Sequence, residues 1–352
     1  MQNDSAEPIN LSKGKQPQVV QSACESQASI RSPLVVVVRV TNECSLRCRF
    51  CGFSNELSLP KKQIDWPSLQ RLGIWLRTVG LQSRRNVLVS WLGGEPFKWP
   101  NWLEASHYFA RQLNLSLSVT TNGLALDKEH VRQQALSLFQ QITISVDGLA
   151  EFHDNLRQVV GMFEKLKKIV GKINQSPMRQ SVLLRINAVL TRENIDSFPA
   201  FCDVMADWGF DELTFNPLGG NDRPEFFPAN RLSAEQVERF INSLEEVRCN
   251  CQSKGLNIRG NKAYIARLLA TARREKISWD DCNPGEHFLF VDENCRLSPC
   301  SFTTQHFGQV ENQPALDLEL SGLIQQFKSV RRERCPAACE DCHANHIYAK
   351  FG

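Results

Sequence analysis

The sequence predicts an α/β fold, in which a partial (β/α)6 TIM-like barrel over residues 34–255 precedes a small C-terminal domain over residues 256–352. Two observations predict it. Short runs of β-branched residues alternate six times with amphipathic stretches from residue 34 onward, and this alternation stops after about residue 255. Repeated strand–helix units form a parallel sheet with right-handed crossovers. In such a barrel the functional groups lie in loops at the C-terminal ends of the strands.

Each element follows from its local pattern. β-Branched and apolar runs predict strands at 34–40, 87–91, 115–120, 142–146, 182–190 and 212–215. Amphipathic stretches predict helices at 65–78, 102–112, 127–139, 156–172 and 195–209, and a further one at 234–254. In the helix at 156–172, Val160, Phe163, Leu166 and Ile169 recur every third residue. Asp127 is the expected N-cap of the helix at 127–139.

The two ends of the chain lack this regular alternation. Residues 1–33 are rich in Gln, Ser, Asn and Pro without an apolar period, which predicts a disordered tail. The pattern of residues 256–352 predicts a short strand, one basic helix and a hairpin at 287–297. We therefore expect a separate small domain after residue 255.

Composition excludes several classes of protein. Of the 352 residues, 42% are hydrophobic and 22% are charged, which is enough to bury a large core. The 41 Lys and Arg residues against 38 Asp and Glu residues give a net charge of +3, and no run of like charges marks a surface for nucleic acid. The longest apolar stretch, residues 34–38, is too short to span a membrane, and the N-terminus lacks a signal-peptide pattern. We expect a cytoplasmic protein with no nucleic-acid or membrane partner.

The cysteines predict metal or redox chemistry. There are thirteen, an odd number, and nine of them fall in two short regions, which argues against a disulfide framework. Cys44, Cys48 and Cys51 follow the first predicted strand with Cys-x3-Cys-x2-Cys spacing. Three thiolates hold three irons of a four-iron, four-sulfur cube and leave the fourth iron open to another ligand. The alternative is a zinc site completed by a distant residue.

Further motifs follow the next strands. Gly93, Gly94, Glu95 and Pro96 follow the second strand; residues 120–123 (Thr-Thr-Asn-Gly) end the third; residues 145–148 (Ser-Val-Asp-Gly) end the fourth, ahead of His153, Asp154 and Arg157. Thr-Asn-Gly or Asp-Gly alone is also an ordinary turn. In this order, and together with the cysteine motif, the segments make the sequence resemble the radical S-adenosylmethionine (SAM) enzymes, in the branch with a C-terminal SPASM or twitch domain. The resemblance covers about residues 34–345.

The resemblance implies a [4Fe-4S] cluster on Cys44, Cys48 and Cys51 that binds S-adenosyl-L-methionine at its open iron. It implies cofactor contacts from Gly93, Gly94, Glu95, Asn122, Ser145, Arg157, Arg185 and Asn216, the glycines allowing backbone carbonyls to approach the methionine ammonium group. Arg185 and Asn187 share one face of the fifth strand, which we expect to be the barrel interior. The anion of a buried Arg185 is either the cofactor carboxylate or the partner in a structural salt bridge. Residues 221–230 are either a substrate loop or a surface excursion.

The second cysteine group predicts an auxiliary site. By resemblance to the twitch type, which holds one auxiliary [4Fe-4S] cluster, its four ligands are Cys282, Cys300, Cys339 and Cys342. The family usually has glycine where this chain has Cys295, and Cys335 is a further candidate ligand that could displace Cys339 or Cys342. Zinc in the same site is the alternative. Four cysteines have no partner at useful spacing and are expected to be tail or packing residues: Cys24, Cys202, Cys249 and Cys251.

The resemblance also implies radical chemistry. An external donor such as flavodoxin or ferredoxin reduces the cluster, SAM is cleaved to methionine and a 5′-deoxyadenosyl radical, and this radical takes a hydrogen atom from the substrate. We expect the net oxidation of a small polar metabolite of sugar or aminocyclitol type, aided by the auxiliary cluster. One alternative is a maturase of a ribosomally made peptide, although the tail before residue 34 is short for a leader-binding domain. The other is a non-enzymatic iron–sulfur or zinc protein. The sequence identifies no catalytic proton-transfer residue.

Overall fold

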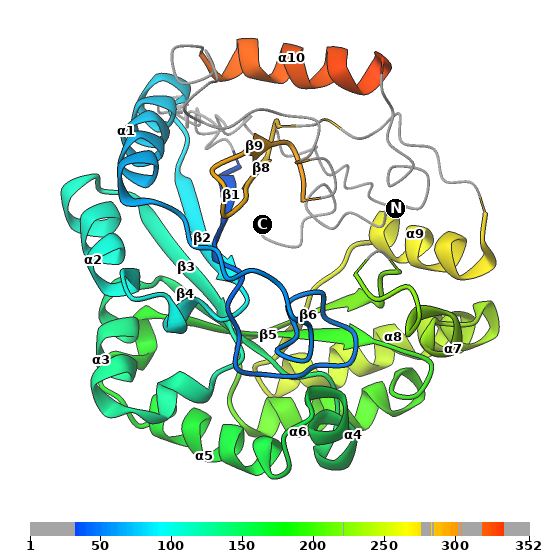
Figure 1. Ribbon diagram of the computed structural model, residues 1–352. Helices are drawn as coiled ribbons and strands as arrows, with labels where there is room; N and C mark the ends of the chain where they lie inside the picture. Colours follow the sequence, from blue (N-terminus) through cyan, green and yellow to red (C-terminus); the bar gives the residue numbers. More distant parts are fainter. Residues whose placement is uncertain are drawn as a thin grey trace, which may run out of the picture. The chain divides into compact units, whose positions relative to one another are not determined.

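The computed structural model describes residues 32–220, 222–275, 283, 285–301, 304 and 319–333, so the tail expected at residues 1–33 lies almost wholly outside the described residues. The strands are β1 (Leu34–Thr41), β2 (Val87–Gly93), β3 (Ser116–Thr121), β4 (Gln141–Ser145), β5 (Leu183–Leu190), β6 (Glu212–Pro217), β7 (Asn257–Ile258), β8 (Phe288–Val291) and β9 (Leu297–Ser298). They form one sheet in the order β7-β6-β5-β4-β3-β2-β1-β8-β9 (Figure 1). β1 to β6 pair consecutively and in parallel, as repeated strand–helix units require.

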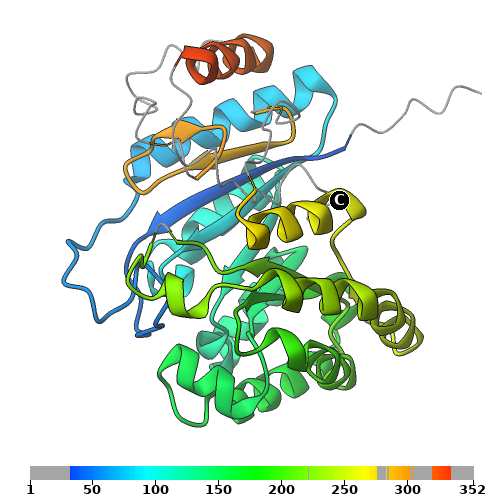
Figure 2. The same cartoon turned by 90° about the vertical axis from the view of Figure 1, so that its right-hand side faces the viewer.

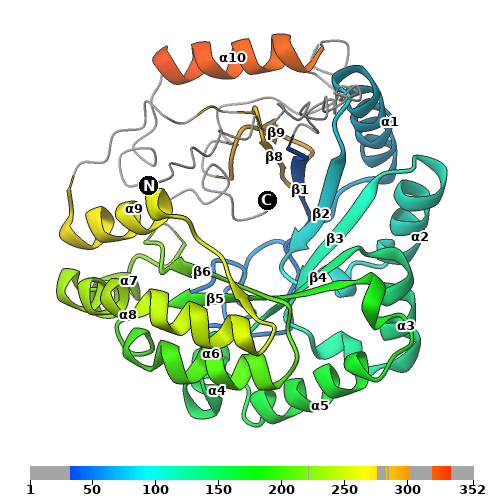
Figure 3. The same ribbon diagram turned by 180° about the vertical axis from the view of Figure 1, so that it is seen from behind.

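Helices connect the parallel strands and cover the outer side of the curved sheet (Figures 1 and 3). They are α1 (Trp66–Ser83), α2 (Trp102–His107), α3 (Glu129–Leu138), α4 (Ala150–Arg157), α5 (Met162–Asn174), α6 (Phe198–Asp207), α7 (Phe227–Asn230), α8 (Ala234–Ser253), α9 (Lys262–Arg273) and α10 (Leu320–Glu333). The side view shows the loop after β1 at the edge where the parallel strands end (Figure 2). None of the helices described is both long and apolar enough to cross a membrane.

The six expected strands are all present, and two expected helices differ from the prediction. The stretch 156–172 forms two helices, α4 and α5, because Gln158 and Gly161 between them adopt positive φ angles of 58° and 76°. Val160 lies in this turn with 99% of its surface exposed, so its place in the apolar period was a coincidence. Asp127 does not cap α3. It ends a 3-10 turn, and its carboxylate accepts a hydrogen bond from Lys172 on α5 instead.

The elements after residue 255 join the same sheet. β7 pairs in parallel with β6, and β8 pairs in parallel with β1 on the other side. The expected short strand, helix and hairpin correspond to β7, α9 and the antiparallel pair β8–β9. The boundary at residue 256 stays a prediction, since most of the chain after residue 301 lies outside the described residues.

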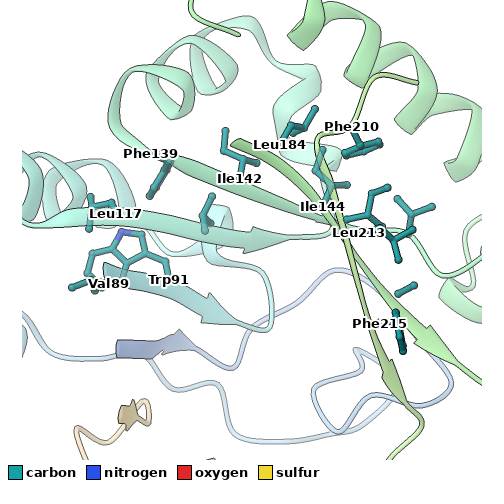
Figure 4. Packing of buried hydrophobic residues seen from close by; sticks show 14 of the residues in the cluster. Val89, Trp91, Leu117, Phe139, Ile142, Ile144, Leu184, Phe210, Leu213 and Phe215 are labelled. Atoms are coloured by element: carbon teal, nitrogen blue, oxygen red, sulfur yellow. The ribbon is translucent and has the colours of Figure 1, made fainter. Parts of the chain in front are cut away.

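The outer and inner faces of the sheet differ in polarity. Leu117, Ile144, Leu184 and Leu213 belong to the large apolar cluster between the sheet and the helices (Figure 4). Because side chains alternate along a strand, their neighbours in sequence face the barrel interior. The inner face is polar on β3 to β6, where the buried residues include Ser118, Thr143, Arg185, Glu212 and Thr214. On β1 and β8 it carries a small apolar cluster of Val35, Val37, Phe288 and Phe290. Arg185 and Asn187 lie on this inner face, as the sequence predicts.

Candidate active site

The first three cysteines lie in the loop that leaves β1, at the C-terminal edge of the sheet. Along this loop Cys44, Leu46 and Cys48 are buried, whereas Arg47 and Arg49 between and beside them are exposed. The backbone N–H of Leu46 donates to the Cys44 Sγ at 3.4 Å, and that of Phe53 donates to the half-buried Cys51 Sγ at 3.4 Å. The loop therefore turns its thiols toward the barrel and its arginines toward solvent.

Burial controls the chemistry of these thiols. It raises the pKa of Cys44 and of Cys48, and it raises the pKa of Cys51 to about 12. The charge of Cys48 acts on both Cys44 and Cys51, so the Cys48 thiol lies within electrostatic range of each of the other two. Thiolates with such raised pKa values need a cation to stay ionised, as iron provides for cluster ligands.

The three thiols of this loop are of the kind that holds an iron–sulfur cluster. In the described part of the chain no group of three His, Cys, Asp or Glu side chains is arranged around one metal ion. In a cubane each thiolate binds a different iron, so its ligands stand farther apart than those of a mononuclear site. Cys44, Cys48 and Cys51 could each hold one iron of such a cluster, which would leave the fourth iron without a protein ligand.

The Gly-Gly-Glu-Pro segment packs directly on the loop after β1 that carries Cys44, Cys48 and Cys51, which we call the cluster loop. The N–H of Gly94 donates to the Thr41 carbonyl at 2.8 Å, and the N–H of Glu95 donates to the Glu43 carbonyl at 2.8 Å. A Cβ at Gly93 would lie 2.3 Å from the Thr41 oxygen, and one at Gly94 would lie 2.3 Å from the Glu43 oxygen. Both glycines are therefore required by the close approach of two backbones, a reason additional to the cofactor contact expected from the sequence.

Glu95 connects the ends of β2 and β3. Its buried carboxylate accepts hydrogen bonds from the Thr121 hydroxyl at 2.7 Å and from the backbone N–H of Asn122 at 2.8 Å, while burial raises its pKa. The side-chain oxygen Oδ1 of Asn122 accepts a hydrogen bond from the backbone N–H of Leu124 at 3.0 Å. Its amide nitrogen is buried and has no hydrogen-bond partner among the described residues. An unpartnered buried donor beside the cluster loop fits a bound polar cofactor.

A buried ion pair links the end of β4 to the cluster loop. Arg157 donates from Nε and Nη2 to the two carboxylate oxygens of Asp147, at 2.6 and 3.0 Å, and its Nη1 lies 3.9 Å from the Cys48 Sγ. The positive charge of Arg157 opposes the rise that burial causes in the pKa of Cys48. His153 accepts a hydrogen bond from the Asp147 N–H at 3.2 Å, and burial lowers its pKa to about 4, so it is neutral there.

The structure places the remaining predicted residues of the barrel on the inner face. Ser145 at the end of β4 lies opposite Asn187 on β5, and Asn216 on β6 donates to the Asn187 side-chain oxygen at 2.9 Å. Arg185 is buried and donates to the Glu212 carboxylate at 2.8 Å. Glu212 thus supplies the anion that the buried Arg185 requires, so the structural salt bridge expected as one alternative is present. A contact of Arg185 with the cofactor stays a prediction.

Only part of the second cysteine group is described. Cys300 is half-buried, and its carbonyl accepts a hydrogen bond from the Ser298 hydroxyl at 2.8 Å. Cys295 adopts a positive φ of 56° in the turn between β8 and β9, a backbone conformation that glycine adopts without strain. The other candidate ligands lie outside the described residues: Cys282, Cys335, Cys339 and Cys342.

Sequence reasoning missed two relationships. The sequence gives Asp147 no role beyond its place in the Ser-Val-Asp-Gly segment, whereas in the structure it is the acceptor that holds Arg157, and it also accepts from the N–H of Val189 at 3.0 Å. Its position directly after β4 was the available signal. Cys202 on α6 and Cys251 on α8, which appeared unpaired in sequence, form a side-chain hydrogen bond in the packed interior.

Comparison with known proteins gives one family match and several distant relatives. The family model described as "Radical SAM superfamily" matches residues 38–205. Fe-coproporphyrin III synthase of Methanosarcina barkeri is 22% identical over 228 residues, 63% of this chain and 53% of that protein. PqqA peptide cyclase of Bradyrhizobium diazoefficiens is 23% identical over 181 residues, 51% of this chain and 45% of that protein. The chain spans about half the length of these two relatives.

Another relative and two solved structures match more of the chain. The sporulation killing factor maturation protein SkfB of Bacillus subtilis is 25% identical over 297 residues, 84% of this chain and 67% of that protein. Streptococcus suis SuiB bound to its precursor peptide SuiA aligns with a TM-score of 0.60 and 16% identity, covering 85% of this chain and 67% of that one. Native anSMEcpe with bound AdoMet aligns with a TM-score of 0.61 and 15% identity, covering 90% and 92%. The two structures share the fold of this chain.

Proposed function

Because the chain belongs to the radical SAM superfamily, in its SPASM/twitch branch, we propose that it is a maturase that uses S-adenosylmethionine to modify a ribosomally made peptide. The observation that carries the radical chemistry is the set of three thiols on one loop, the buried Cys44 and Cys48 and the half-buried Cys51, in a loop that packs against Gly94 and Glu95.

The relatives support a peptide over the small polar metabolite that we expected from the sequence. PqqA peptide cyclase and SkfB are named for peptide or maturation chemistry, and SuiB is described with a bound precursor peptide. SkfB also matches more of this chain than Fe-coproporphyrin III synthase does. We therefore place the peptide first and withdraw the sugar or aminocyclitol reading.

When bound, the cluster and its cofactor supply a 5′-deoxyadenosyl radical that takes a hydrogen atom from the substrate. The side chains of the barrel bind and orient. In this proposal the Asn122 amide nitrogen donates to the cofactor, Arg157 holds its charge beside Cys48, and the inner-face residues Ser145 and Asn216 line the cofactor pocket. Arg185 anchors Glu212. An auxiliary cluster on Cys282, Cys300, Cys339 and Cys342 would accept an electron from the substrate radical.

The radical chemistry is tested with anaerobically reconstituted protein. We expect about eight irons per chain in the wild type and slow formation of 5′-deoxyadenosine without substrate, since the two cysteine groups hold about four irons each. Changing Cys44, Cys48 and Cys51 together to Ala should leave about four irons and abolish 5′-deoxyadenosine. Undiminished cleavage in the triple variant contradicts the assignment.

The peptide substrate needs a separate test. Short peptides encoded beside this gene are incubated with the reconstituted enzyme and analysed by mass spectrometry, with the triple cysteine variant as the control. A mass change that depends on SAM and on the first cluster supports the maturase. Oxidation of a sugar or aminocyclitol from the same gene neighbourhood, with the peptides unchanged, refutes it.

A further inference from the structure

The outer surface of the cluster loop carries two arginines without an ionic partner. Arg47 and Arg49 are exposed, while Cys48 between them is only 4% exposed. Among the described residues no carboxylate forms an ion pair with either guanidinium. The loop thus presents free positive charge within one residue of a buried cluster ligand.

A hollow of about 440 Å³ opens beside these arginines. Its lining also includes Arg223, Glu56 and Glu225, which belong to the segments after Cys51 and after β6. Arg223 pairs with Glu225 and lies 3.5 Å from Glu56, so both carboxylates of the hollow are held by the same arginine. The three arginines and two carboxylates of the lining leave a net charge of +1, and since neither Arg47 nor Arg49 pairs with a carboxylate among the described residues, their side of the hollow attracts anions.

We propose that this face, defined by Arg47, Arg49 and the hollow beside them, is the docking site of a small acidic electron-transfer protein. The inference rests on the proposed function, because radical chemistry at Cys44, Cys48 and Cys51 needs one electron from outside the chain. Cys48 is buried while its neighbours Arg47 and Arg49 are exposed, so a donor protein seated on the two arginines would lie over the loop that carries this thiol. In the transfer the reduced donor loses one electron and the cluster gains it, and no bond or proton moves.

Charge reversal on this face provides the test. The variant Arg47→Glu/Arg49→Glu is compared with Lys167→Glu/Lys168→Glu, an equal change of charge at exposed positions on α5. The probe is a recombinant bacterial flavodoxin. Its affinity is measured by calorimetry at low and high salt, and 5′-deoxyadenosine formation is measured with photoreduced flavodoxin and, separately, with dithionite. Iron content is measured for every protein.

We expect the arginine variant to bind flavodoxin about tenfold or more weakly at low salt, and to need correspondingly more flavodoxin for half-maximal rate, since charges across an interface steer association. High salt should reduce the difference between the variant and the wild type. Dithionite-driven cleavage and iron content should match the wild type, and the lysine variant should behave as the wild type in every assay.

Three results would overturn the proposal. Unchanged flavodoxin affinity in the arginine variant would show that this face does not bind the donor, and loss of binding to the precursor peptide alone would assign the face to substrate. An equal loss of activity with dithionite would show that the arginines act on the cluster itself. Failure of the wild type to cleave SAM with dithionite refutes the proposed function instead, while the calorimetry still decides the docking.

Discussion

The buried pair of Asp147 and Arg157 should make folding sensitive to the loss of either charge. Asp147 has no exposed side-chain surface and Arg157 has 10%, and two hydrogen bonds of 2.6 and 3.0 Å join them. Two unit charges about 4 Å apart attract by about 4 kcal/mol at an effective dielectric constant of about 20. Removing one partner of such a pair costs about 3–5 kcal/mol, because the other charge stays buried without compensation. Asp147→Asn should therefore lower the free energy of unfolding by about 3–5 kcal/mol. This is a large share of the free energy of unfolding of a typical domain, about 5–15 kcal/mol.

Anaerobic urea unfolding of the cluster-free protein, followed by tryptophan fluorescence, measures this loss. The double variant Asp147→Leu/Arg157→Met removes both charges and should recover most of the stability lost in Asp147→Asn, since a buried pair replaced by apolar side chains is close to neutral. A loss below about 1 kcal/mol in Asp147→Asn, the level of an exposed salt bridge, would refute the reasoning. A double variant less stable than Asp147→Asn would refute it too, because it would assign the loss to packing.

Three further predictions concern other parts of the barrel. Burial holds the pKa of His153 at about 4, against 6.5 for an exposed histidine. As the pH falls from 6.5 toward 4, the unfolded chain takes up a proton at this residue that the folded chain does not, so the free energy of unfolding should fall by about 3 kcal/mol. Urea unfolding of the wild type and of His153→Asn across this pH range measures the loss. Gly94→Ala should cost about 1–3 kcal/mol in the same assay because its Cβ meets the Glu43 carbonyl, whereas Gly171→Ala, in open space on a helix, should be neutral or stabilising. Iodoacetamide should modify exposed Cys249 before Cys202 and Cys251, which are buried, and mass spectrometry of the native protein reports the order.

The strands were predictable from the sequence because each has a local cause. Alternating apolar runs placed β1 to β6 within a few residues of their observed ends, and the order of motifs placed Cys44 and Gly93 at neighbouring strand ends. The break between α4 and α5 was not predictable, because periodicity counts Val160 as helical while the positive φ angles of Gln158 and Gly161 end one helix before the next begins. A non-glycine residue in the left-handed region carries no reliable signal in sequence.

The site was less predictable than the fold because its contacts join residues distant in sequence. The anion of Arg185 is Glu212, twenty-seven positions later, and the bond between them depends on the register of β5 against β6. Arg157 meets Cys48 across 109 positions of chain, through a loop geometry that no periodicity encodes. The sequence indicated which side chains bear chemistry, whereas the pairing among them required the sheet.

The cluster loop shows how one short segment serves two surfaces. Buried and exposed residues alternate along it, so Cys44, Leu46 and Cys48 are buried while Arg47 and Arg49 are exposed to solvent. Exchanging Leu46 for a charged residue would bury that charge. Exchanging Arg47 for leucine would weaken the attraction of the hollow's rim for anions without altering the thiols. The ligand spacing and the surface charge are therefore separable in mutagenesis although they share eight residues, which is what allows electron delivery and cluster binding to be tested independently.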